Sequence, residues 1–101
     1  MVIDILENEF DEKIKETCVV DFSTSTCPAC TRLSPVFEQV SGEMDIPFYS
    51  VNLENAMPLA QRFSIMYVPT VIVFKDGKAA AVTSGALSDA ELTAFIEEAI
   101  A

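Results

Sequence analysis

The run Cys18-Val-Val-Asp-Phe22, followed shortly by Cys27-Pro-Ala-Cys30, is the most informative stretch of this chain. The first stretch is apolar apart from one carboxylate, which is typical of a strand covered on both faces. Beyond the second stretch, apolar residues recur with the spacing of an amphipathic helix, at Leu33, Val36, Phe37, Val40 and Met44. The two cysteines are therefore expected at the start of a helix that follows directly on a buried strand.

The sequence before and after this unit alternates between strand and helix patterns. It predicts a strand over 2–6 and then a helix that Asn8 caps, with Asp11 at its third position, and that ends near Thr17. A strand over 48–53 and a short helix over 57–63 follow. The order is thus βαβαβα, which is typical of a sheet that is parallel in part.

The last third of the chain predicts a hairpin and a closing helix. Strands over 71–74 and 79–83 flank Asp76-Gly77, a pair that favours a type I′ turn. Ser88 and Glu91 form a capping box, with Leu87 and Leu92 placed as a hydrophobic staple, for a helix up to residue 100. We therefore expect one α/β domain over 1–101, with a central mixed sheet and helices on both faces.

Composition excludes several classes of function. Sixteen acidic residues against six basic ones give a formal net charge of −10, so nucleic acid and anionic membranes are not expected partners. The absence of histidine removes Ser-His and Cys-His catalysis. No secretory signal is visible in the first ten residues, and we expect a cytoplasmic monomer. In that reducing compartment a close cysteine pair points to catalysis, redox sensing or metal binding.

Cys27-Pro28-Ala29-Cys30 carries the chemistry, because it places two thiols across the first turn of a helix. The unpaired amides there stabilise a thiolate, so Cys27 is expected to be the nucleophile. Cys30 lies one turn deeper and is better placed to resolve a mixed disulfide. Two other interpretations remain open, namely half of a metal site and a pair of inert thiols.

Several further motifs resemble those of thioredoxins in order and spacing, over nearly the whole chain. They are Val20-Asp21-Phe22, Cys27-x-x-Cys30, Pro35, Val68-Pro69-Thr70, Phe74-Lys-Asp-Gly77 and Gly85-Ala-Leu-Ser88. The resemblance implies the thioredoxin fold, thiol–disulfide exchange with client proteins, and a cis Val68–Pro69 bond beside the cysteines. It implies no bound cofactor apart from the redox-active Cys27–Cys30 disulfide, and electrons from a thioredoxin reductase that is flavin- or ferredoxin-linked.

Asp21 is the third candidate catalytic residue, because a carboxylate inside an apolar strand is either hydrogen-bonded, protonated or useful. The resemblance implies that it relays a proton to the resolving cysteine. Burial would raise its pKa toward neutrality, where a general base serves thiol chemistry. The alternative is an edge-facing Asp21 in contact with solvent.

The resemblance also implies a client-binding groove around Cys27. Its expected members are Thr26, Pro28, Ala29, Tyr67, Val68, Pro69 and Gly85. The backbone of Val68 would pair with an extended client segment. Tyr67 could instead belong to the core, Pro69 could follow an ordinary trans bond, and Cys18 is expected to be a core residue.

Three departures from the thioredoxin pattern leave alternatives open. Thr26 replaces the usual Trp, Pro28-Ala29 replaces Gly-Pro, and bulky Tyr67 replaces a small residue. Proline directly after the first cysteine resembles glutaredoxins, although little positive charge is present to hold the carboxylates of glutathione. A dimer that binds a metal or an iron–sulfur cluster through both cysteine pairs is the remaining alternative, and Pro69 would obstruct it.

Overall fold

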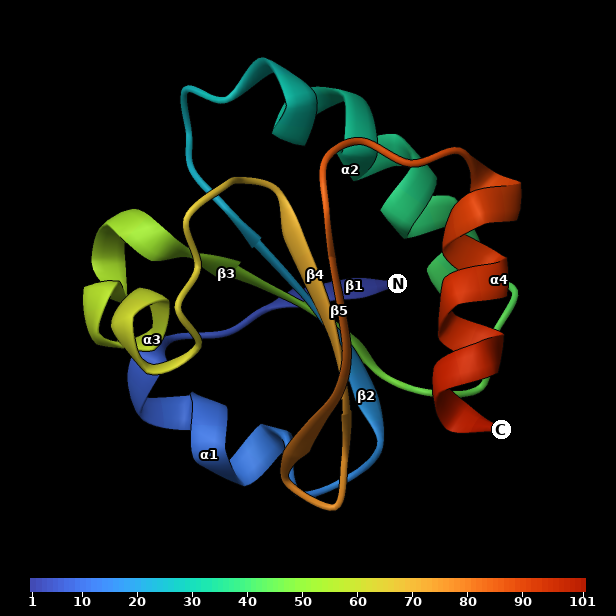
Figure 1. The fold of residues 1–101 in the computed structure, drawn as a ribbon, viewed down its shortest axis with the longest axis horizontal. Helices are drawn as coiled ribbons and strands as arrows, with labels where there is room; N and C mark the ends of the chain where they lie inside the picture. Colours follow the sequence, from blue (N-terminus) through green and yellow to red (C-terminus); the bar gives the residue numbers. More distant parts are fainter.

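The computed structural model describes residues 1–101 and contains one five-stranded sheet with helices on both faces (Figure 1). The strands are β1 (Val2–Asp4), β2 (Cys18–Ser23), β3 (Phe48–Asn52), β4 (Thr70–Lys75) and β5 (Lys78–Ser84). Their order across the sheet is β1-β3-β2-β4-β5. Strands β1, β3 and β2 run parallel, whereas β4 is antiparallel to both β2 and β5. The predicted mixed sheet, parallel in part, is confirmed.

Two pairs of helices cover the two faces of the sheet. The helical segments are η1 (Glu7–Glu9), α1 (Phe10–Lys13), α2 (Pro28–Ser41), η2 (Leu53–Asn55), α3 (Met57–Arg62) and α4 (Asp89–Ile100). Figure 1 shows α2 and α4 on one side of the strands and α1 and α3 on the other. No helix combines the length and the apolarity that crossing a bilayer requires.

Strand β2 lies at the centre of the sheet, as its apolar pattern predicts. Val19 packs in the cluster beneath α2 and α4, whereas Val20 and Phe22 pack in the cluster beneath α1 and α3. Because side chains alternate along a strand, Asp21 lies on the same face as Val19, beneath α2. Both clusters bury most of β2, and Asp21 is only 5% exposed.

The first helix differs from its prediction at both ends. Asn8 is not a cap, because the chain enters a 3-10 turn in which the Leu6 N–H donates to Glu9 Oε1 at 2.8 Å. Helix α1 ends at Lys13 rather than near Thr17. The carbonyl of Ile14 instead accepts from Gly77 N–H of the β4–β5 turn at 3.1 Å. A contact distant in sequence thus replaces the next helical turn.

Three other boundaries move inward for local reasons. Strand β1 ends at Asp4, because the 3-10 turn over Glu7–Glu9 follows soon after, although Ile5 N–H still donates to the Ser50 carbonyl at 3.0 Å. Helix α2 ends at Ser41 rather than Met44, and Gly42 N–H bonds the carbonyls of the preceding turn. Strand β3 ends at Asn52, whose side-chain Oδ1 accepts from Glu54 N–H at 2.8 Å and so begins a turn.

The predicted hairpin and the last capping box are confirmed. Asp76 and Gly77 both have positive φ, 54° and 80°, as a type I′ turn requires. Ser88 Oγ accepts from Glu91 N–H at 3.1 Å, and Ser88 N–H donates to Glu91 Oε1 at 2.9 Å. A register shift between Val73 and Phe74, which the sequence does not predict, adds an irregularity to the β4–β5 ladder.

Candidate active site

The backbone places Cys27 at the N-cap of α2, immediately after the loop that leaves β2. Its extended φ and ψ, −106° and 112°, end the loop, and Pro28 occupies the first helical turn, where a missing N–H costs nothing. The Cys27 carbonyl accepts from both Thr31 N–H and Thr31 Oγ1, at 3.1 and 3.2 Å. The position of both cysteines at the start of the helix is confirmed.

The sulfur of Cys27 contacts groups from two parts of the chain. Cys30 N–H donates to Cys27 Sγ at 3.1 Å, and Cys27 Sγ donates to the Val68 carbonyl at 3.5 Å. The thiol is half-buried and free. Cys27 is therefore the thiol that a disulfide can reach, since Cys30 and Cys18 are both buried.

Cys30 lies deeper and is only 7% exposed. Burial, together with a side-chain hydrogen bond to Cys27, raises the pKa of the Cys30 thiol to about 11, although a backbone hydrogen bond with Thr24 opposes this. Cys30 is therefore protonated at neutral pH, behind the more accessible Cys27. To attack a mixed disulfide it must first lose that proton.

Asp21 supplies a group that could accept this proton. Its Oδ1 is buried and has no hydrogen-bond partner, and burial raises the pKa of the carboxyl to about 7. The interpretation of Asp21 as a solvent-exposed edge residue is wrong. Asp21 also interacts electrostatically with Cys30 and helps to raise the pKa of that thiol.

The loop before β4 lies against Cys27, as the resemblance implies. The Val68–Pro69 peptide bond is cis, so the trans alternative is wrong. Gly85 N–H, beyond the end of β5, donates to the Pro69 carbonyl at 2.8 Å. Gly85 has a φ of +92°, which side chains other than glycine rarely adopt. These contacts bring Val68, Pro69 and Gly85 to the side of Cys27.

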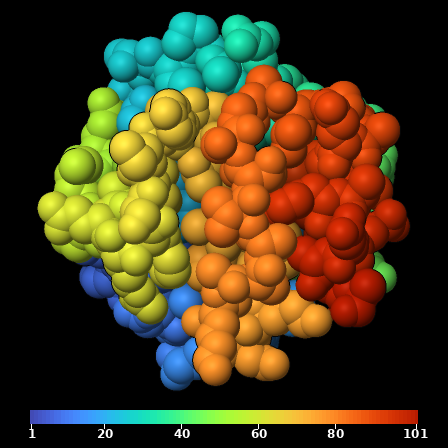
Figure 2. Space-filling view, viewed as in Figure 1, coloured from blue at the N-terminus to red at the C-terminus, as the bar shows by residue number.

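The other predicted groove residues are at the surface but do not form one cavity. Thr26 and Pro28 are exposed, and Ala29 is half-buried. Tyr67 is 72% exposed, which excludes the core interpretation. It lines a hollow of about 220 Å³ with Phe63, Ser64, Ile65, Met66, Thr70, Val82, Thr83 and Ser84. Figure 2 shows these two segments, before β4 and at the end of β5, side by side on the surface.

A pair that sequence reasoning missed ties the loop before Cys27 to the end of β3. Glu54 Oε1 accepts from Ser25 N–H at 3.2 Å and from Ser25 Oγ at 2.7 Å. These bonds lower the pKa of the Glu54 carboxyl. The two residues are 29 positions apart, so no local pattern links them.

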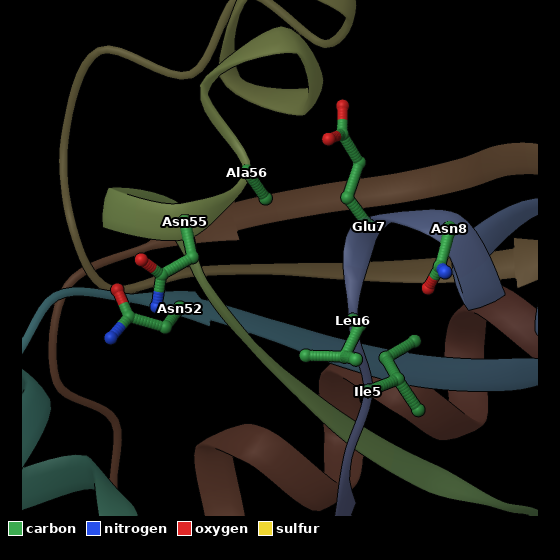
Figure 3. Close-up of a pocket in the computed structure, with 7 residues that line it drawn as sticks. All are labelled: Ile5, Leu6, Glu7, Asn8, Asn52, Asn55 and Ala56. Carbon is green, nitrogen blue, oxygen red and sulfur yellow. The ribbon is translucent and has the colours of Figure 1, made fainter.

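A larger hollow, of about 270 Å³, lies where β1 and β3 end (Figure 3). Figure 3 shows Asn52 and Asn55 on one side of it and Glu7 and Asn8 on the other. Its lining holds no thiol, and Glu7 is its one titratable residue.

The third thiol, Cys18, lies apart from the pair, in the core of the protein. Cys18 is fully buried, and burial raises the pKa of its thiol to about 12, so its expected place in the core is confirmed. No group of three or more His, Cys, Asp or Glu side chains lies close enough to hold a metal ion. The site is a pair of free thiols at a helix start, one half-buried and one buried, beside a cis-proline loop and a buried carboxyl.

Comparisons with known proteins agree with the resemblance to thioredoxins. The family model described as Thioredoxin matches residues 1–98. The chain is 36% identical over 104 residues to probable thioredoxin-2 of Caenorhabditis elegans, covering 98% of this chain and 71% of the relative. It is 35% identical over 94 residues to a thioredoxin-like protein of Fusarium culmorum, covering 86% and 78%. It is 30% identical over 104 residues to thioredoxin of Buchnera aphidicola, covering 98% and 96%.

The chain belongs to the thioredoxin family of oxidoreductases, and Cys27–Cys30 is its redox-active CxxC centre. The resemblance drawn from the motifs and the thioredoxin fold expected from them are both confirmed.

Proposed function

We propose that the protein reduces disulfides of client proteins through a cycle between the Cys27–Cys30 dithiol and disulfide. The observation that carries the proposal is the contrast between the two sulfurs. Cys27 Sγ is half-exposed and accepts an amide hydrogen bond, whereas the Cys30 thiol lies behind it, buried and protonated. This is the arrangement that a nucleophile and a resolving thiol need.

The reaction proceeds in two exchanges. The Cys27 thiolate attacks one sulfur of the client disulfide, and the other client sulfur leaves and takes up a proton. Cys30 then loses its proton to Asp21 and attacks Cys27 Sγ, which breaks the mixed disulfide and releases the second client thiol. The client gains two electrons and two protons, and the protein is left with a Cys27–Cys30 disulfide. A thioredoxin reductase, flavin- or ferredoxin-linked, supplies the electrons that restore the dithiol.

Client binding is proposed along the surface beside Cys27. The N–H of Val68 donates to no group of the chain, so it is free to pair with an extended client segment. Pro69 and Gly85 hold this loop in place through their 2.8 Å hydrogen bond. Thr26, Pro28, Ala29 and Tyr67 form the surrounding surface that a client would contact.

The test is reduction of insulin disulfides with candidate electron donors. Cys27→Ser should abolish the reaction, whereas Cys30→Ser should stop after the mixed disulfide and retain clients from a cell extract. A wild-type protein that reduces insulin disulfides no faster than dithiothreitol does alone would refute the proposal. Turnover by glutathione alone, with no flavoprotein, would support a glutaredoxin-like cycle instead.

We also propose that the protein acts as a cytoplasmic monomer with no bound metal. Three free thiols, two of them buried, suit a reducing compartment. Gel filtration and metal analysis of the purified protein test the last two points. A dimer that retains iron or zinc would favour the cluster-binding alternative.

A further inference from the structure

Two hollows lie beside the groups proposed to exchange a proton, Cys30 and Asp21, and one residue lines both hollows. The first, of about 370 Å³, is lined by Ser23, Thr24, Cys30, Thr31, Ser34 and Pro35. The second, of about 220 Å³, is lined by Val2, Asp4, Asp21, Ser34, Phe37, Glu38 and Ser50. The resolving thiol therefore borders one hollow and the buried carboxyl borders the other, and Ser34 is the one residue common to them.

Secondary structure explains why Ser34 takes this place. Ser34 follows Cys30 by four positions on α2, so the two side chains lie on the same side of the helix. Beneath the helix, Asp21 pairs in register with Ser50 of β3, and Ser50 pairs with Asp4 of β1. Ser34 thus lies where the row of polar side chains on the sheet meets the helix that carries Cys30.

The unpartnered oxygen of Asp21 explains why the position of Ser34 matters for the chemistry. Asp21 is only 5% exposed, and its Oδ1 finds no donor within the chain although the residue borders a polar hollow. Buried polar atoms in such hollows are commonly satisfied by water. A serine hydroxyl can donate one hydrogen bond and accept others, so it can join waters in two adjacent hollows.

We propose that Ser34 is a positioning residue for the resolving step, whose hydroxyl orders the hydrogen-bonded path from Cys30 Sγ to Asp21 Oδ1. The inference rests on the proposed disulfide exchange. A proton leaves the Cys30 thiol along this path as Ser34 passes its own hydroxyl proton onward, and Asp21 gains one proton in total. Cys30 is left as the thiolate that attacks Cys27 Sγ, so charge and protons balance.

The charged groups around the path are few. Asp4 of β1 and Glu38 of α2 are the other two carboxylates that border the hollow of Asp21. Ser50 of β3 borders it as well and is neutral. On the β4 side, Val71 pairs with Asp21 and carries no charge. Glu38 Oε2 is engaged by Val2 N–H at 2.8 Å. Neither hollow is lined by a cation, and Asp4 and Glu38 line only the hollow of Asp21, so a hydroxyl or water must take the proton from the side of Cys30.

The experiment compares Ser34→Ala with Ser50→Ala in single-turnover reduction of a fluorescent peptide disulfide between pH 6 and 9. Ser50 borders only the hollow of Asp21, so its variant is the matched control. Ser34→Ala should slow decay of the mixed disulfide about three- to tenfold near pH 7, because water replaces the hydroxyl only in part. Formation of the mixed disulfide by Cys27 should keep its wild-type rate. Ser34→Thr should restore resolution.

A double variant sharpens the test. If Ser34 acts through Asp21, then Ser34→Ala should add no further slowing to Asp21→Asn. Ser34 is exposed on a helix, where alanine is the better helix former, so the variant is expected to fold. Equal resolution rates in wild type and Ser34→Ala, or equal slowing by Ser50→Ala, would overturn the role of Ser34. A wild-type protein that forms no mixed disulfide would instead refute the proposed function.

Discussion

At the scale of single residues, the three cysteine thiols differ in how deeply they are buried. Cys18 is enclosed in the core and its pKa rises to about 12, while burial raises the pKa of Cys30 to about 11. Cys27 is the most accessible of the three and receives an amide hydrogen bond. The same physical cause, removal of water, raises the pKa of Asp21 to about 7. Position in the fold therefore assigns each group its reactivity.

Iodoacetamide added to the native reduced protein at pH 8 should label Cys27 well before Cys30 or Cys18, because the thiolate is the reacting form and must be accessible. Peptide mass spectrometry over time measures the order. Cys27→Ser serves as the control and should take up almost no label in the same interval. Similar labelling rates at Cys27 and Cys30 would contradict the assignment of the nucleophile.

Asp21→Asn should stabilise the protein in a pH-dependent manner. In the unfolded chain the carboxyl ionises near its ordinary pKa of 3.8, whereas in the folded protein it ionises near 7. Between these values the folded state holds a proton that the unfolded state releases, so the wild-type free energy of unfolding falls as pH rises. The advantage of the variant should grow from about pH 4 to pH 7 and then level off, at roughly 4 kcal/mol or less.

Urea unfolding of both proteins at pH 4, 5.5, 7 and 8 measures this difference. Asp4→Asn, at the far end of the same row of side chains, is the control, since Asp4 is exposed and should show little of the effect. A constant difference between Asp21→Asn and wild type across this range would show that Asp21 ionises normally in the folded protein.

At the scale of elements, hydrogen bonds between loops that are distant in sequence hold the site together. The Ser25–Glu54 pair joins the β2–α2 loop to η2, and Gly85 joins the end of β5 to the cis-proline loop. Helix α2 supplies Cys27 at its cap, Cys30 one turn later and Ser34 a turn beyond that. One helix therefore carries the proposed nucleophile, the proposed resolving thiol and the proposed positioning residue.

Glu54→Ala should loosen the loop that precedes Cys27, because Ser25 loses the acceptor of both its N–H and its hydroxyl. Amide hydrogen exchange at Ser25 should become faster at pH 7. The folded-state pKa of Glu54 is lowered, so its stabilisation is present above the unfolded pKa and disappears as pH falls through the folded value. The variant and wild type should therefore converge in acid.

Glu97→Ala, an exposed change on α4, is the control and should leave exchange at Ser25 unaltered. Glu54→Gln keeps an acceptor oxygen and should recover part of the protection. Unchanged exchange in Glu54→Ala would mean that the loop is held by other contacts.

At the scale of the whole molecule, the net charge affects how often partners of either charge encounter the protein. A net charge of −10 and an isoelectric point near 4.1 give the surface a negative potential at neutral pH. Such a field raises the encounter rate of basic clients and lowers that of acidic ones. Salt screens it over a Debye length of about 8 Å at physiological ionic strength.

Two peptide disulfides of equal length, one flanked by lysines and one by glutamates, should therefore react at different rates in low salt. The cationic peptide should be reduced faster, and the two rates should converge as NaCl is raised to about 0.5 M, where the Debye length falls well below about 8 Å. Stopped-flow measurement of kcat/KM tests this. Equal rates in low salt would show that local contacts beside Cys27 outweigh the overall field.

Much of this architecture follows from local pattern. Four features depend on residues that are close in sequence, and the structure confirms them. They are the apolar run of β2, the helical spacing after Cys27, the Asp76-Gly77 turn and the Ser88 capping box. The first helix is the exception, because its last turn competes with a hydrogen bond from Gly77 to Ile14. Local propensity does not register such a competitor.

The family, the cysteine pair at a helix start and the carboxyl within a central strand are all predictable from the amino-acid sequence, since each depends on the order of neighbouring residues. The folded chain adds three relations: Asp21 Oδ1 is left without a partner, Glu54 holds Ser25, and Ser34 borders the hollows of both Cys30 and Asp21. These relations depend on how helix and sheet pack, because burial and contact between distant segments exist only once the chain has folded.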